Sequence, residues 1–349
     1  MDDQAALKYL YRLGFFILLG PALLALYIAT QPINFSDRAY PLWTRQLEIA
    51  RESNASGAAV PVNEPARGLI TGDSRVQAAL IPDEIGPRVQ SLALMSSTPI
   101  DSYFLLRDYL VHHAAPEWIV FSFAPYHLQR DNESFFWNHS VKYGAHGLGD
   151  FRELLARSHA LDEPLLPGAG RLRVAAEWLL YRAKFPPYYM AELKAANLFS
   201  RRKQNLATAS EIEEGRGHYF YGCGNGSSAI SKEATLEAFQ ASPLLDSYLR
   251  SGIEMAIDAD SQVLLRAMPM NESSHHALSS RFAADYRGYF ESLGAAYPQI
   301  VVDPELPFLP DSHFSDGSHV NERGAKRLSG EFVAFLESRS SLLARVGTQ

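Results

Sequence analysis

The sequence predicts an α/β fold in which helices cover a parallel sheet, carried on one N-terminal membrane helix. Three observations predict it. The 349 residues are 47% apolar and 20% charged, with 23 glycines and 20 prolines, a balance typical of a folded globular protein. From Arg67 onward, short β-rich runs alternate with helical patterns. Before them lies one long apolar segment, which begins at Leu13. At this length, one or two domains are expected.

The apolar segment runs from Leu13 to Thr30 and is expected to cross a membrane once. As a helix, its 18 residues span roughly 27 Å, close to the thickness of a bilayer core. Lys8 and Arg12 precede it, so the positive-inside rule leaves residues 1–12 in the cytoplasm. The rest of the chain would then lie on the periplasmic or extracellular side of the cytoplasmic (inner) membrane. A cleaved signal peptide is the alternative, although LYIATQP offers no small-x-small cleavage site.

The soluble part begins with a linker and continues as one α/β domain over residues 67–340. The linker, residues 31–66, contains scattered Pro, Ser and Asn and one short helix at Tyr40 to Arg51. Strands are expected at Gly68 to Gly72, Val89 to Met95, Trp118 to Phe123, Gln262 to Met268 and Gln299 to Val302. Helices are expected at Ser74 to Leu80, Ile100 to His113, Pro243 to Ala259, His276 to Leu293 and Glu322 to Ser338.

An insertion at about residues 126–242 interrupts the alternation of strands and helices. It contains helical stretches such as Leu172 to Ala183, and it ends in the glycine-rich run YGCGNGSS. Its aromatic residues include Phe135, Phe136, Trp137, Tyr143, Tyr188, Tyr189, Tyr219, Phe220 and Tyr221. Two interpretations are compatible: a helical cap with its own small core, or a lid that binds an acceptor above the sheet.

Charge and cysteine content exclude several classes of function. The net charge is −7 and no basic stripe stands out, so nucleic acid is not an expected partner. The single cysteine, Cys223, excludes an internal disulfide and any cysteine-rich metal site, and a buried position is expected for it. No cluster of ligands has metal-binding spacing, so neither a metal nor another cofactor is expected.

The first candidate for chemistry is the run Gly72, Asp73, Ser74, which follows the first strand and opens the next helix. Ligands of open α/β sheets bind beyond the carboxyl ends of the strands. A serine there faces the crevice, and the backbone N–H groups at the helix start can stabilise a developing oxyanion. The alternative is a plain helix cap without catalytic role.

The second candidate is the pair Asp316 and His319, which precedes the last helix. A serine hydroxyl needs a base at neutral pH, and histidine serves because its ordinary pKa lies near that pH. A carboxylate three residues earlier, on a tight turn, can accept a hydrogen bond from Nδ1 and leave Nε2 for the serine. A loop pair without function or half of a metal site are alternatives, and Asp311 and His313 are nearby competitors.

Two motifs together resemble the SGNH (GDSL-type) hydrolase superfamily: Gly-Asp-Ser between a strand and a helix, and Asp-x-x-His before the last helix. The resemblance covers about residues 67–340. The resemblance implies a three-layer, flavodoxin-like fold. It also implies Ser74 as nucleophile, His319 as general base and Asp316 as its orienting acid. The family's other oxyanion donors are a glycine after the second strand and an asparagine after the third.

The chain departs from this pattern at both of those positions. Ser96 or Ser97 stands in place of the glycine, and the third strand ends in FSFAPYHL without the asparagine. Asp73, Ser96 and Ser97 are therefore candidates for oxyanion or substrate contacts. Tyr126, His127 and Arg130 border the expected cleft and are candidates for substrate binding, with surface or lid packing as the alternative.

In these departures and in its single anchor, the chain resembles a subgroup of membrane-anchored SGNH-like proteins that accompany membrane-bound O-acyltransferases. Examples act in alginate and cellulose O-acetylation and in teichoic acid D-alanylation. The passages SYFLLRDYL and DGSHVNERGA carry this resemblance. It implies a membrane-bound O-acyltransferase partner and a glycan acceptor. The function expected is acyl transfer, with acetyl as the expected group, to a cell-surface or exported polysaccharide through an acyl-serine. An extracytoplasmic carbohydrate or lipid esterase and a non-catalytic assembly or glycan-binding subunit are the alternatives.

Overall fold

The computed structural model describes residues 3–30, 38–52, 65–129, 136–166, 168–189 and 201–339. Its centre is a sheet of five parallel strands in the order β2-β1-β3-β4-β6. The strands are β1 (Gly68–Gly72), β2 (Val89–Ser91), β3 (Trp118–Ser122), β4 (Gln262–Arg266) and β6 (Val301–Asp303). The expected α/β class with a parallel sheet is thereby confirmed.

The strands form because their side chains are apolar on both faces, as parallel sheets covered by helices require. Successive residues alternate between two separate cores: Leu69 and Ile119 belong to one, and Ile70 and Val120 to the other. All four are fully buried. The sheet is therefore the middle layer between two groups of helices.

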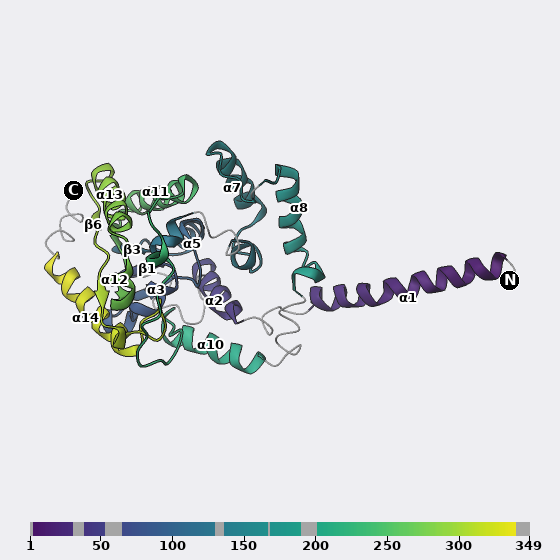
Figure 1. Ribbon diagram of the computed structural model, residues 1–349, viewed down its shortest axis with the longest axis horizontal. Helices are drawn as coiled ribbons and strands as arrows, with labels where there is room; N and C mark the ends of the chain where they lie inside the picture. Colours follow the sequence, from purple (N-terminus) through teal and green to yellow (C-terminus); the bar gives the residue numbers. More distant parts are fainter. Residues whose placement is uncertain are drawn as a thin grey trace.

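Helices from distant parts of the chain cover the two faces (Figure 1). The first core is closed by α2 (Ala39–Arg51), α5 (Pro99–His112), α11 (Pro243–Asp258) and α13 (Ser280–Ala296). The second is closed by α3 (Ser74–Ala79), α4 (Pro82–Ile85) and α14 (Glu322–Ser338). Figure 1 shows α14 and α2 on opposite sides of the strands.

Several expected elements differ in the structure: β4 ends two residues earlier than expected, and β6 begins two residues later. The second strand is shorter than expected, but the N–H groups of Leu92 and Leu94 still donate to β1 carbonyls at 2.8 and 2.9 Å, so the extended pairing continues past Ser91. The helix expected at 276–293 is two helices, α12 (Glu272–Ala277) and α13. They separate because the Ser279 hydroxyl caps the start of α13. A small second sheet of β5 (Met270–Asn271) and β7 (Phe308–Leu309) was not expected.

The expected linker contains a helix that belongs to the domain core. Trp43 on α2 is fully buried, and its indole N–H donates to the Met95 carbonyl at 3.0 Å. Gln46 on the same helix donates to the carbonyls of Ala93 and Gly217. Residues 31–37 and 53–64 of the expected linker lie outside the described residues.

The insertion is mainly helical and packs on the domain through a third hydrophobic core. Its elements are η3 (Phe136–Val141), α7 (Leu148–Ala160), α8 (Arg171–Arg182), η4 (Pro186–Tyr188) and α10 (Arg202–Glu214). Trp137, Phe151 and Val174 fill a core that is shared with α5 and α11. Of the aromatic residues named above, Trp137 lies in this core, whereas Tyr143 and Tyr221 pack against the two cores of the sheet. Phe135 and Arg130 lie outside the described residues.

The N-terminal helix α1 (Asp3–Thr30) projects away from the domain (Figure 1). Its part from Ala6 to Ile28 is long and apolar enough to cross a membrane, and nearly all of it is unburied by the rest of the chain. The helix begins ten residues before the expected anchor, because no Gly or Pro interrupts the chain between Asp3 and Arg12. It also runs through Pro21.

Candidate functional site

Ser74 lies at the carboxyl edge of the sheet, at the first position of α3. A sharp turn at Gly72 brings it there: Gly72 has φ +138°, and a Cβ at this position would lie 1.8 Å from the Ser122 carbonyl oxygen. Only glycine fits such a contact. The chain leaves β1 toward β2 on one side and leaves β3 toward β4 on the other. The strand order therefore reverses between the neighbours β1 and β3, and open α/β sheets bind ligands at such a point.

His319 reaches Ser74 from the loop before α14. Its Nε2 lies 2.8 Å from Ser74 Oγ, and its Nδ1 lies 2.9 Å from Asp316 Oδ2. The loop is held as a narrow hairpin, since the Ser315 N–H donates to the His319 carbonyl at 2.8 Å. The structure thus brings the hydroxyl, the imidazole and the carboxylate of these three predicted residues into one hydrogen-bonded chain.

Asp316 is fixed by its own turn and stays ionised. Its Oδ1 accepts the backbone N–H groups of Ser318 and His319, both at 2.8 Å. Burial raises the pKa of Asp316, but the His319 ring and these two N–H groups outweigh burial and bring the pKa down to about 2. A carboxylate that is charged over the physiological pH range favours a proton on Nδ1 of His319 and leaves Nε2 to accept from Ser74.

Asp73, Ser97 and His127 form a buried polar layer beneath Ser74. Asp73 caps α3 by accepting the Arg75 N–H at 2.9 Å, and it also accepts the Ala124 N–H at 2.6 Å. Ser97 Oγ donates to the Gly72 carbonyl at 2.7 Å, and His127 Nδ1 donates to the Ser97 carbonyl at 2.6 Å.

Each of these three residues has at most 2% of its surface exposed, so their side chains do not face the solvent from which a substrate would approach. Burial lowers the pKa of His127, and the charge of Asp73 opposes that shift. The sequence predicted that Asp73, Ser97 and His127 contact the oxyanion or the substrate. In the structure, their side chains are instead buried below the site. They join the loops after β1, β2 and β3 beneath the site.

Ser96 and Tyr126 remain at the rim of the site, both partly exposed. Ser96 has φ +57°, the left-handed conformation that favours glycine. The backbone at Ser96 therefore adopts a conformation that glycine reaches more easily than serine. Burial raises the pKa of Tyr126 well above its ordinary value, and the charges of Asp73 and Asp316 add to that shift while Arg75 opposes it.

Tyr221 is a site residue that the sequence analysis did not single out. Its ring stacks on the imidazole of His319, with centroids 4.4 Å apart and planes at 24°. Its hydroxyl donates to Gln77 on α3. The signal in the sequence is the glycine-rich run that begins at Tyr221, which allows the insertion to return close to the site, since Gly224 packs against the Ser315 backbone.

A buried ion pair ties the end of the insertion to α3. Arg75 Nη1 lies 2.5 Å from Glu233 Oε1, and both side chains are almost fully buried. Burial lowers the pKa of Arg75, but the charge of Glu233 outweighs it and keeps the guanidinium protonated. Removing one partner of such a pair is strongly destabilising because a charge is left uncompensated.

The competing residues in the last loop have other partners. Asp311 accepts the N–H and the hydroxyl of Ser273 at 3.0 and 2.6 Å. His313 is buried. Within the described ranges, no three His, Cys, Asp or Glu side chains form a group that could hold a metal ion.

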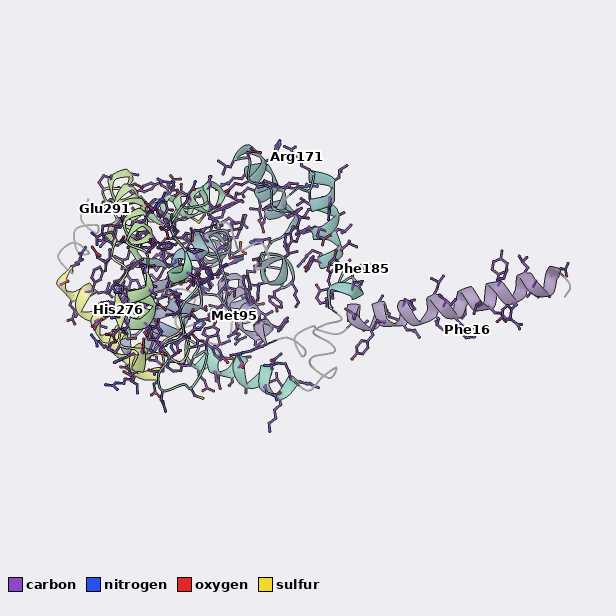
Figure 2. The ribbon with its side chains drawn as sticks, viewed as in Figure 1. Phe16, Met95, Arg171, Phe185, His276 and Glu291 are labelled. Carbon is purple, nitrogen blue, oxygen red and sulfur yellow. The ribbon has the colours of Figure 1, made fainter. Side chains whose placement is uncertain are left out.

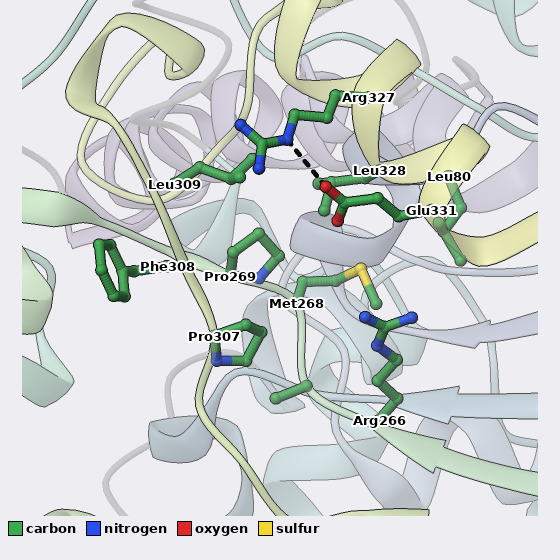
Figure 3. A pocket seen from close by; sticks show the side chains of 11 residues that line it. Leu80, Arg266, Met268, Pro269, Pro307, Phe308, Leu309, Arg327, Leu328 and Glu331 are labelled. Carbon is green, nitrogen blue, oxygen red and sulfur yellow. Dashed lines mark hydrogen bonds and ion pairs between the residues drawn. The ribbon is translucent and has the colours of Figure 1, made fainter. Parts of the chain in front are cut away.

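Two hollows lie near this end of the domain. A groove of about 870 Å³ runs between the glycine-rich run (Gly222, Cys223, Gly224) and the start of α14, next to the His319 loop. Cys223 lines it and is exposed, contrary to the buried position expected for it. A cavity of about 70 Å³ lies between the end of β4 and α14 (Figure 3), lined by Met268 and Leu309 among others and not by Ser74 or His319.

Comparison with protein-family models and with curated proteins gives no match for this chain. The chemistry of the site is therefore what indicates a function for this chain.

Proposed function

We propose that this chain is a membrane-anchored, serine-dependent O-acyltransferase of SGNH type that works outside the cytoplasm. One observation carries the proposal: His319 Nε2 lies 2.8 Å from Ser74 Oγ with Asp316 on its other nitrogen, across 245 residues of sequence. A serine, a histidine and a carboxylate in this order constitute the arrangement that activates serine for acyl transfer. The strand order, with β1 between β2 and β3, is also that of flavodoxin-like doubly wound sheets and supports an SGNH-type fold.

The first half-reaction forms an acyl-serine. Ser74 Oγ attacks the carbonyl carbon of an acyl donor, and His319 Nε2 takes the hydroxyl proton. The tetrahedral intermediate then expels the donor's oxygen or sulfur, which receives that proton from His319. Asp316 holds the ring in position and stabilises the imidazolium that forms between these two proton transfers.

The second half-reaction repeats these steps with a sugar hydroxyl. The acceptor hydroxyl gives its proton to His319 Nε2 and attacks the acyl-serine carbonyl. Ser74 leaves and regains the proton from His319, so that the enzyme returns to its starting state. In the overall reaction, the ester or thioester of the donor becomes an ester of the sugar, and no cofactor is consumed.

Backbone N–H groups at the rim are the proposed oxyanion donors. At the start of α3, the N–H of Arg75 is occupied by Asp73, whereas Ser74 stands at the first helical position, where an N–H has no carbonyl partner inside the helix. The loop at Ser96, with its glycine-like backbone, supplies the second proposed donor. Removing one such donor costs an enzyme about 100- to 1000-fold in rate.

The proposed partners follow from topology. Helix α1 crosses the cytoplasmic membrane once, with the α/β domain on the periplasmic or extracellular side. A single crossing cannot carry an acyl group through the bilayer, so a membrane-bound O-acyltransferase is proposed to supply it. A glycan is the proposed acceptor, and the groove beside the His319 loop, with Arg323 and Lys326 on its wall, is open enough for a polymer.

Transfer is tested by incubating the full chain in detergent with an acylated donor and an exported polysaccharide. We expect ester groups on the polysaccharide, and none with Ser74→Ala. A specific observation favours an esterase as second candidate: the Asp316 side chain is 49% exposed, so water reaches the site. Acyl release into water without transfer would establish the esterase, and full biological activity of Ser74→Ala would exclude both enzymes.

A further inference from the structure

Helix α8 carries an apolar stripe that faces away from the protein. Leu172 is 89% exposed and Leu179 is 60% exposed. Ala176 and Ala183, also exposed, share this stripe, because the spacings of four, three and four residues place all four on one side of a helix. Phe185, 42% exposed, continues the apolar surface just beyond the end of the helix.

This stripe is additional to the face that α8 uses for packing. Val174 is buried in the insertion core, and Trp178 on the same side stacks on Phe151 with ring centroids 4.9 Å apart. The helix therefore has an inner apolar face that the domain covers and an outer one that it does not cover. Exposed leucines on a helix that needs none of them for folding indicate an interaction surface.

Basic residues border the stripe on both sides. Arg171 and Arg182 flank it along one edge, and Arg173 lies near the other, as the helical angle of 100° per residue requires. Lys184 follows the helix. From Arg171 to Tyr189 the chain has four basic residues and one acidic residue, a local charge of +3 in a chain whose net charge is −7.

The segment that follows α8 contacts the anchor helix. Ile28, near the end of α1, is buried against Tyr189, which follows η4, and Tyr188 packs on the same cluster. Figure 1 shows α8 on the side of the domain from which α1 projects, running across the direction of α1. In Figure 2, Phe185 marks the end of α8 nearest to α1. A helix in that position lies along the surface of any bilayer that α1 spans.

We propose that α8 is an interfacial membrane-binding helix, whose outer stripe inserts among the lipid headgroups of the bilayer that α1 crosses. Leucines within the acyl boundary, arginines that extend to anionic headgroups and tyrosines at the interface are the chemistry that such helices use. A second contact beside the anchor fixes the height and the orientation of the α/β domain over the membrane. This inference rests on the proposed membrane crossing of α1.

The test measures the depth of single fluorescent labels in the full chain, reconstituted into vesicles of phosphatidylethanolamine and phosphatidylglycerol. In a Cys223→Ser background, which removes the only cysteine, Leu179→Cys, Phe16→Cys and Glu291→Cys each carry an environment-sensitive dye. Phe16 lies 12 residues before Ile28, roughly 18 Å along the helix and thus near the bilayer centre. Glu291 is exposed and lies far from α1 (Figure 2).

We expect a blue-shifted dye at Leu179 that is quenched by nitroxides near the headgroups, a dye at Phe16 that is quenched by nitroxides near the chain ends, and no quenching at Glu291. An unquenched dye at Leu179 beside a quenched dye at Phe16 would overturn this inference and leave the anchor intact. An unquenched dye at Phe16 would instead refute the membrane crossing, and with it this inference. Protection of Leu179 that appears only after a membrane protein is added would overturn it in favour of a protein partner.

A charge variant tests the same surface independently. Arg171→Gln, Arg173→Gln and Arg182→Gln together are expected to reduce the ratio of docked to undocked α8 by about fivefold per charge in anionic vesicles. The matched control is Arg281→Gln with Arg287→Gln on α13, two exposed arginines that should leave the Leu179 signal unchanged. Equal effects of the two variants would contradict docking of α8.

Discussion

Replacing Asp316 by asparagine tests whether this residue orients the histidine. An asparagine Oδ1 preserves the acceptor for the N–H groups of Ser318 and His319, so the turn should stay folded. Its amide group, however, would face His319 Nδ1 with a donor in place of an acceptor. The ring would then favour the tautomer with its proton on Nε2, the wrong side for accepting from Ser74.

The size of the effect follows from the pKa of Asp316. It falls from 3.8 to about 2 in the folded chain, although burial alone would raise it, and this shift corresponds to about 2.5 kcal/mol of interaction. Because the side chain is 49% exposed and asparagine keeps both N–H hydrogen bonds, the energy lost in the variant is smaller, about 1–1.5 kcal/mol. We therefore expect about a tenfold slower reaction of Ser74. A fully buried aspartate in this role would cause a larger loss.

The assay is the second-order rate constant for reaction with a fluorescent fluorophosphonate, followed by gel fluorescence at pH 7. Asp311→Asn is the matched control, because Asp311 lies in the same loop region and binds Ser273 rather than His319. The control should react at the wild-type rate. An unchanged rate for Asp316→Asn, or equal losses in both variants, would refute the role assigned to Asp316.

Three further predictions concern the support of the site. Burial lowers the pKa of His218 from 6.5 to about 4, so between these pH values only the unfolded chain binds the proton. The His218 contribution should thus lower the free energy of unfolding by about 3 kcal/mol from pH 7 to pH 4. Chemical denaturation at both pH values should show this decrease in the wild-type chain and not in His218→Gln. Gly72→Ala places a methyl group 1.8 Å from a β3 carbonyl oxygen, and a drop in melting temperature of many degrees is expected; an unchanged melting curve would contradict the turn. Tyr221→Ala removes about 0.5–1.5 kcal/mol of stacking on His319 and should slow fluorophosphonate labelling several-fold, whereas Tyr221→Phe should retain most of the rate.

Local patterns were sufficient to place the sheet and the candidate nucleophile. The strand Gly68 to Gly72 and the helix Glu322 to Ser338 have the bounds expected from sequence, because each is a clear apolar pattern with a turn or cap residue at its ends. The position of Ser74 after a strand and that of His319 before a helix likewise follow from local patterns.

Tertiary contacts decided the features that the sequence did not reveal. Nothing in residues 39–51 distinguishes a linker helix from a core helix until α5 and the sheet cover Trp43. The stacking of Tyr221 on His319 depends on a chain return across most of the insertion. The burial of Asp73, Ser97 and His127 depends on three loops that meet, which no single segment encodes.

The most direct test of the central claim is to locate a covalent adduct after reaction of the full chain with a fluorophosphonate. We predict that peptide mass spectrometry finds the phosphonyl group on Ser74 alone, and that His319→Ala abolishes or greatly slows its formation. An adduct on another residue, or equal labelling of Ser74 in the presence and absence of the His319 imidazole, would contradict the account.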